Sequence, residues 1–305
     1  MSDHPAVPDA GVAEPAAPES AASEPTAPTG AGGRVIDLSV VVVGTPEQVW
    51  EAIATGPGIS SWYVPTTVAP HAGGAMIQRF GEAPEMAIPG TVTAFEPPHR
   101  VVFAGGEPGD SLAFEWLVQA RDGGSCVVRL VNSGFGEGQE WDAMYDGMAE
   151  GWPLFLRNLQ LHLEHFAGQS GQAMLPMALF PAGEPGVWSR LMTALGWPES
   201  ASLGDRLATS EPTPPLAGTV AGTGANRLWL LLDEPAPGTA IVAAEGAGVS
   251  VWAYLYGPEA ADVAGRSGAR WQEWLTAQAG DGADQAGNAA GQAGDAADQA
   301  RAAAG

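Results

Sequence analysis

Residues 45–53 read Thr-Pro-Glu-Gln-Val-Trp-Glu-Ala-Ile and carry the signals that begin an amphipathic helix. Thr45 stands at the N-cap, Pro46 at the first helical position and Gln48 at the third, which is the arrangement of a capping box. Apolar side chains then recur at helical spacing until the Gly-Pro-Gly of residues 56–58. The sequence therefore predicts a helix that begins at Pro46 and stops before this turn.

Strand-like segments lie on both sides of this helix. Residues 35–43 are rich in β-branched side chains and predict a strand before it, and a short second helix is expected over residues 59–63. The further predicted strands are residues 66–68, 75–80, 90–95, 101–104, 112–121 and 126–132. Successive short strands with tight turns predict an antiparallel meander.

One long helix closes this unit. Large apolar side chains recur every three or four positions from Asp142 to Phe166. Pro153 lies inside this helix and removes one backbone donor, so we expect a kink near Gly151. A helix lying across a curved antiparallel sheet is an α+β helix-grip arrangement, which we predict for residues 34–168.

Three motifs of this segment resemble the START/Bet v 1-like (SRPBCC) superfamily, in particular the subfamily named after the activator of the heat-shock protein 90 ATPase. The motifs are residues 45–53 followed by 59–63, residues 90–103, and Glu150-Gly151-Trp152 with Leu156, Leu159 and Leu163. The resemblance implies a hollow between sheet and helix. Members of the superfamily include lipid binders, cyclases, stress proteins and co-chaperone relatives. The resemblance therefore supplies no shared set of catalytic residues.

Residues 169–279 predict a second, smaller α+β domain. A helix over residues 185–195 ends at Gly196, and a last helix carries Trp271, Trp274 and Leu275. The strands expected between them are residues 228–233, 240–244 and 249–256. The order of elements echoes the first domain, and a degenerate copy is one interpretation.

Composition excludes several classes of protein. The 305 residues carry 35 acids and 12 basic residues, a net charge of −23, which disfavours nucleic acid and anionic lipid surfaces as partners. No apolar run reaches about 18 residues, so no membrane span is expected. The single cysteine, Cys126, excludes an internal disulfide or a cysteine-cluster zinc site.

The two ends of the chain are low in complexity. Residues 1–33 are rich in Pro, Ala and acids, and residues 280–305 repeat Gly, Ala, Asp and Gln. Both predict disordered tails. Since the first tail has neither a basic nor an apolar segment of a secretion signal, we expect a cytoplasmic protein.

The closing helix carries a pair of histidines that could share a metal. His162 and His165 lie three positions apart on one face, but no third ligand is near in sequence. We prefer the interpretation that they complement the dipole of the helix C-terminus, and we expect neither metal nor cofactor.

The acids of the chain suggest little catalytic chemistry. Glu137, Glu140, Asp142, Asp146 and Glu150 favour the positive end of the closing helix and are expected to face water. Glu115 alternates with aromatic residues on a strand. It therefore points to solvent, the preferred alternative, or forms the charged wall of a cavity.

Two further candidates also have ordinary explanations. The glycine pairs at residues 136–138 and 222–224 lack the context of a phosphate site and are interpreted as loops. Cys126 begins an apolar strand without a nearby base, so we interpret it as a buried structural thiol.

Aromatic and methionine side chains give the most informative set. They form either a solid core or the walls of a ligand cavity beneath the closing helix. The predicted ligand-binding residues are Trp62, Phe80, Phe103, Phe114, Trp116, Met144, Tyr145, Met148, Trp152 and Phe155. The groups expected to orient a ligand are Tyr145, Arg79 and His99.

We therefore expect a small-molecule-binding protein that holds an apolar or amphipathic ligand beneath residues 142–166, and we expect Trp152→Ala to alter its affinity. Two alternatives stay open. One is a chaperone-associated or stress-response partner, and the other is a cyclase or hydratase that uses the same cavity.

Overall fold

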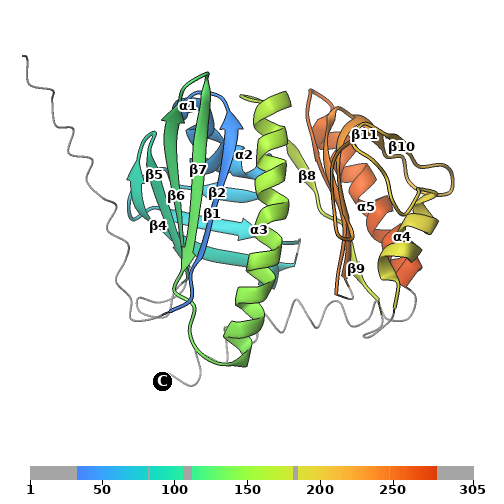
Figure 1. The fold of residues 1–305 in the computed structure, drawn as a ribbon, viewed down its shortest axis with the longest axis horizontal. Helices are drawn as coiled ribbons and strands as arrows, with labels where there is room; N and C mark the ends of the chain where they lie inside the picture. Colours follow the sequence, from blue (N-terminus) through green and yellow to red (C-terminus); the bar gives the residue numbers. More distant parts are fainter. Residues whose placement is uncertain (1–32, 82, 106–111, 181–184, 247, 280–305) are drawn as a thin grey trace, which may run out of the picture. The chain divides into compact units, whose positions relative to one another are not determined.

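The computed structural model describes residues 33–279, except 82, 106–111, 181–184 and 247 (Figure 1). The predicted tails, residues 1–32 and 280–305, lie outside these described residues. Contacts within the chain place the described residues in a single unit, so the boundary between the two predicted domains stays a prediction.

The first sheet is an antiparallel meander closed by its first strand. Its order is β1-β7-β6-β5-β4-β3-β2, so β1 pairs with the last strand. The strands are β1 (Ile36–Val43), β2 (Thr66–Val68), β3 (Ala75–Arg79), β4 (Ala87–Glu96), β5 (Arg100–Gly105), β6 (Leu112–Arg121) and β7 (Ser125–Ser133). A 3₁₀ turn, η1 (Pro84–Met86), precedes β4. These strands agree with the predicted ones to within a few residues.

Two short helices follow β1. Helix α1 (Pro46–Ala54) has the predicted capping box, in which Thr45 N donates to Gln48 Oε1 at 2.9 Å and Gln48 N donates to Thr45 Oγ1. The predicted second helix is wrong in its bounds, because α2 spans Gly56–Ser60. Thr55 ends α1 and also caps α2, since Gly58 N donates to its hydroxyl at 3.1 Å.

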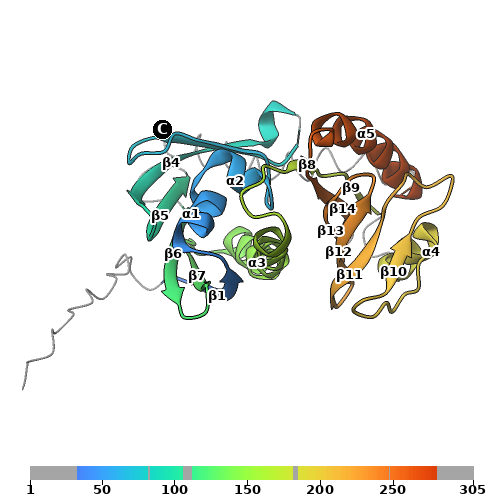
Figure 2. The ribbon, with the colours of Figure 1, turned by 90° about the horizontal axis from the view of Figure 1, so that it is seen from above.

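Helix α3 (Gln139–His165) lies along the inner face of the first sheet, and Figure 2 looks down its axis. It continues through Pro153 as one helix. This arrangement is the helix-grip fold predicted from the sequence.

A second antiparallel sheet follows. Its order is β10-β11-β12-β13-β14-β8, and β9 also pairs with β14. The strands are β8 (Gln172–Met174), β9 (Met177–Leu179), β10 (Arg206–Ala208), β11 (Ala217–Gly224), β12 (Arg227–Glu234), β13 (Gly238–Glu245) and β14 (Gly248–Leu255). Helix α4 (Val187–Leu195) ends at Gly196 as predicted, and α5 (Ala260–Ala279) carries Trp271 and Leu275 into the core.

The loop predicted at residues 222–224 is wrong, because these residues belong to β11. A Cβ at Gly222 would stand 3.1 Å from the indole of Trp229, so a small residue fits where the two strands pack closely.

Both sheets share one pattern of connections. In each, the first strand pairs with the last, a meander comes later and a long helix ends the unit, but two helices follow β1 in the first unit, whereas β9 and then the single helix α4 follow β8 in the second. The second sheet reaches this order with a meander of five strands instead of six. A truncated copy would have this topology, but common descent stays a prediction.

Helix α3 is buried on nearly all sides between Leu154 and Leu163, where Arg157 and Gln160 alone are not buried. Each of these two reaches a backbone carbonyl of a different sheet. Gln160 Nε2 donates to Val41 O of β1 at 2.8 Å. Arg157 Nη2 donates at 2.7 Å to Ala221 O, which a β-bulge in β11 leaves outside the regular ladder.

A buried polar cluster joins the end of α3 to the residue after β14. Tyr256 Oη donates to Ser61 O at 2.7 Å and lies 2.8 Å from His162 Nδ1. Because the phenol hydrogen is used on Ser61, Nδ1 of His162 must carry a hydrogen and donate it. Burial lowers the pKa of His162 to about 4. The predicted dipole interaction is therefore wrong for His162, since a neutral ring adds no charge at the helix end.

The buried histidine makes stability depend on pH. The pKa of His162 is about 4 in the fold against 6.5 as the reference value, so the unfolded chain binds the proton first. The contribution of the neutral ring to the free energy of unfolding is present above pH 6.5 and is lost as the pH drops toward 4. About 2 kcal/mol of the free energy of unfolding is lost by pH 5. Urea unfolding of the wild type and of His162→Gln at pH 7 and pH 5 should show this loss in the wild type only. An equal loss in both proteins would contradict the assignment.

Candidate functional site

Aromatic side chains from the first sheet, α3 and the segment that follows α2 meet at one place. Tyr63 stacks on Trp152 with ring centroids 5.3 Å apart and meets Phe155 edge-on at 4.6 Å. Trp116 meets Trp152 edge-on at 5.6 Å. The predicted residues that join this cluster are Trp62, Phe80, Phe103, Phe114, Trp116, Trp152 and Phe155. We call these rings with Tyr63 the aromatic cluster.

The aromatic cluster fills the space that the resemblance predicts to be hollow. The cavity left among the rings has a volume of about 10 Å³, which is room for about one water molecule. It is lined by Ile53, Ile59, Trp62, Tyr63, Gln78, Phe103, Phe114, Trp116 and Trp152. This cavity is too small for the expected ligand, and the binding role of these side chains stays a prediction.

The remaining predicted residues lie outside this cavity lining. Met144 is 38% exposed on the outer part of α3, and Met148 packs at the border of the core. Tyr145 stacks edge-on with Phe135 and lies below Arg34. Neither Arg79 nor His99, the other expected polar groups, lines the cavity.

A larger space opens on another side of α3. Its volume is about 320 Å³, and it lies between α3 and strands β9, β13 and β14. Its lining residues are Gly151, Leu154, Phe155, Met177, Leu179, Ile241, Glu245, Gly248, Val249, Ser250 and Trp252. We call this space the α3–β14 groove.

The groove has aromatic walls and an open side. Phe155 of α3 stacks on Trp252 of β14 with ring centroids 5.4 Å apart. A Cβ added at Gly151 would meet no atom within 4 Å, so this turn of α3 faces open space. Met177, 40% exposed, has its backbone N–H and carbonyl held by the Gln272 side chain of α5.

Glu245 gives the groove its charge. Burial raises the pKa of the Glu245 carboxyl, Arg227 acts in the opposite direction, and Glu150 raises it further. The guanidinium of Arg227 stands 3.7 Å from Glu245 Oε1. Its other donors face the backbone carbonyls of Ala225 at 3.1 Å and Glu150 at 3.5 Å.

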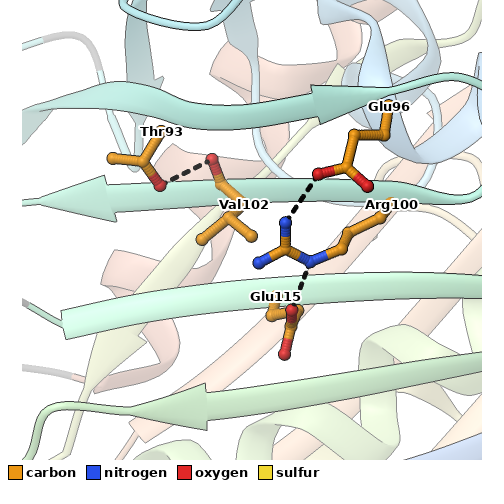
Figure 3. A network of polar contacts seen from close by, with 5 residues as sticks. All are labelled: Thr93, Glu96, Arg100, Val102 and Glu115. Carbon is orange, nitrogen blue, oxygen red and sulfur yellow. Dashed lines mark hydrogen bonds and ion pairs between the residues drawn. The ribbon is translucent and has the colours of Figure 1, made fainter. Parts of the chain in front are cut away.

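Glu115 corrects a further expectation. It points away from the aromatic cluster, since Trp116 faces α3, but it is only 9% exposed. Its carboxylate accepts a hydrogen bond from Arg100 Nε at 2.6 Å, and Arg100 Nη1 also donates to Glu96 at 2.8 Å (Figure 3). The predicted solvent-facing carboxylate is thus a covered ion pair on the outer face of the first sheet.

The other candidates behave as ordinary structural residues. The acids at the start of α3 are exposed, and Cys126 is fully buried with a raised pKa caused by desolvation. Among the described residues no group of histidine, cysteine and acidic side chains could hold a metal ion. In the same part of the chain, no helix is long and apolar enough to cross a membrane.

Residues 44–164 match the family model described as "Activator of Hsp90 ATPase homolog 1-like protein" (AHSA1). This segment is an AHSA1-like domain. The match covers the helix-grip fold from the end of β1 to the end of α3, as the sequence motifs predicted. The second sheet and the β-strand walls of the α3–β14 groove lie outside the AHSA1-like domain. No curated protein matches the chain.

The chain is similar to several solved structures at low sequence identity. Protein MLL2253 from Mesorhizobium loti is 20% identical, with 44% of this chain and 98% of that chain covered and a TM-score of 0.38. The Aha1 dimer from Colwellia psychrerythraea is 21% identical, with 43% and 97% covered and a TM-score of 0.36. DynU16, from the dynemicin biosynthetic locus, is 16% identical, with 80% and 97% covered and a TM-score of 0.38. No activity of this chain follows from these likenesses.

The sequence predicts one wall of the groove but not the other. Phe155 is among the predicted residues, whereas Trp252, Ile241 and Glu245 are not. Val251 and Trp252 are neighbours on β14 and place apolar side chains on both of its faces, which indicates two-sided packing. Nothing in the sequence places that strand beside α3.

The covered ion pair predicts an uneven response to mutation. Arg100→Met removes the guanidinium that donates a hydrogen bond to the covered Glu115 carboxylate, and should lower the free energy of unfolding by about 1–3 kcal/mol. Arg129→Met removes a pair with Asp37 that is exposed on both sides, and should cost less than about 1 kcal/mol. Adding Glu115→Gln to Arg100→Met should recover part of the loss. Chemical unfolding of these variants measures all three effects, and equal losses for the two arginines would contradict the burial argument.

Proposed function

We propose that this protein binds a small apolar or amphipathic molecule, without catalysis, in the α3–β14 groove. The observation that carries the proposal is the size and lining of this groove. Small-molecule sites have volumes of about 300–1,000 Å³ and mostly apolar walls with few polar groups. The groove, with about 320 Å³, reaches this range, while the cavity in the aromatic cluster does not.

The polar content of the groove favours binding over catalysis. Glu245 is its single ionisable lining residue among those described, with Ser250 as the one hydroxyl. General acid–base chemistry on a cyclised or hydrated substrate would have to rely on this carboxyl alone. The enzymatic alternative therefore predicts that turnover disappears in Glu245→Gln.

A chaperone-associated function is the second candidate, and it rests on the description of the matching family. Its test is the ATPase rate of a bacterial Hsp90 with and without the purified chain. Stimulation would support this function, and an unchanged rate would leave the ligand-binding proposal as the better one.

The binding proposal predicts saturable uptake of a neutral fluorescent probe. N-phenyl-1-naphthylamine should bind with one site per chain, because its naphthyl and phenyl groups match the aromatic walls. Gly151→Leu should weaken binding at least tenfold by filling the open side of the groove. Fluorescence titration measures both effects.

Gly147→Leu provides the matched control. Gly147 lies one turn earlier on α3, also has open space around its Cβ direction and does not line the groove. Both variants replace a helical glycine with a better helix former, so neither should lose stability. If Gly151→Leu binds the probe as the wild type does, the groove is not the site.

A further inference from the structure

We propose that the α3–β14 groove selects apolar ligands that carry an amine, with the ammonium group bound by Glu245. This inference rests on the proposed function and names the chemical class of its ligand. Its basis is the charge distribution at the mouth of the groove, together with the nature of the walls.

The Glu245 carboxylate has a charged partner that is not within hydrogen-bond distance. The side chain is 42% exposed at the end of β13, where it lines the groove. Its nearest cation, Arg227, stands 3.7 Å away, which is beyond hydrogen-bond distance. Arg227 directs its nearer contacts to the carbonyls of Ala225 and Glu150. The carboxylate therefore has room for a donor at closer range.

The neighbouring charges favour a cation. Glu150 acts on Glu245 as a second negative charge, so two acids and one arginine surround the mouth. Partial burial raises the pKa of Glu245, which shows that its charged form has lost hydration. An ammonium group in contact would restore a charged partner to the carboxylate.

The walls suit the rest of such a ligand. Phe155 and Trp252 both line the groove, and the parts of these rings that their mutual stacking leaves uncovered offer aromatic surface to a cation or another ring. Leu154, Ile241 and Val249 add apolar surface. A ligand with an aromatic body within the groove and an amine at its mouth would contact both the apolar walls and the Glu245 carboxylate.

Three matched compounds test this selection. They are 2-naphthylmethylammonium, 2-naphthylmethanol and 2-naphthoate, which share the same rings and differ in charge. Their affinities are measured by calorimetry at pH 7.5 in about 0.3 M salt, which screens the general field of a chain with net charge −23. We expect the ammonium compound to bind about tenfold more tightly than the alcohol, and the carboxylate most weakly.

Two variants and a control assign the preference. Glu245→Gln should bring the ammonium-to-alcohol ratio to about one, while Arg227→Met should raise the ratio by removing the competing cation. Glu140→Gln removes the same charge from an exposed position in the first turn of α3 and should leave the ratio unchanged.

The outcomes separate the two proposals. If the alcohol binds but the ammonium compound has no advantage, or if Glu245→Gln keeps that advantage, the amine selection is wrong and the groove remains a binding site. If none of the three compounds binds, the proposed function and the amine selection are both overturned.

Discussion

The burial of α3 on nearly all sides is the constraint on which the rest of the structure depends. A helix that covers one sheet normally keeps a polar face toward water. Here the segment from Leu154 to Leu163 is apolar around most of its circumference, so a single sheet cannot satisfy it. The second sheet supplies the missing surface, and Trp229 fixes it to the helix through a hydrogen bond to Leu154 O at 3.0 Å.

The same constraint explains where space remains. Inside the AHSA1-like domain, bulky rings occupy the concave face of the sheet and leave about 10 Å³. On another side of α3, the groove opens at Gly151, which has no side chain and lies just before the buried segment of the helix. The larger of these two spaces thus lies beside the AHSA1-like domain and is lined in part by residues that follow it in the chain.

Local chemistry made much of the fold predictable. The capping box of Thr45 and the alternation of the first-sheet strands depend on neighbours in sequence, and both are visible in it. The start of α2 was missed because one residue, Thr55, ends one helix and begins the next. The strand at Gly222 was missed because its glycines fit against Trp229, a contact that no local pattern shows.

The candidate site was predictable only in part. Spacing indicates that Trp116 and Trp152 face inward, but whether inward rings fill a space or surround one depends on sheet curvature and side-chain packing. The groove combines Phe155 with Trp252 and Glu245, nearly a hundred residues further along the chain. Such a juxtaposition follows from tertiary packing and not from any window of sequence.

The contact between Gln160 and Val41 has a consequence for assembly. As the outermost strand of its sheet, β1 would offer free backbone groups to a strand of another molecule. The side-chain amide of Gln160 donates a hydrogen bond to the carbonyl of Val41, and α3 packs beside β1. Extension of this sheet into a continuous intermolecular one is therefore blocked along that border, which protects a strand rich in valine from aggregation.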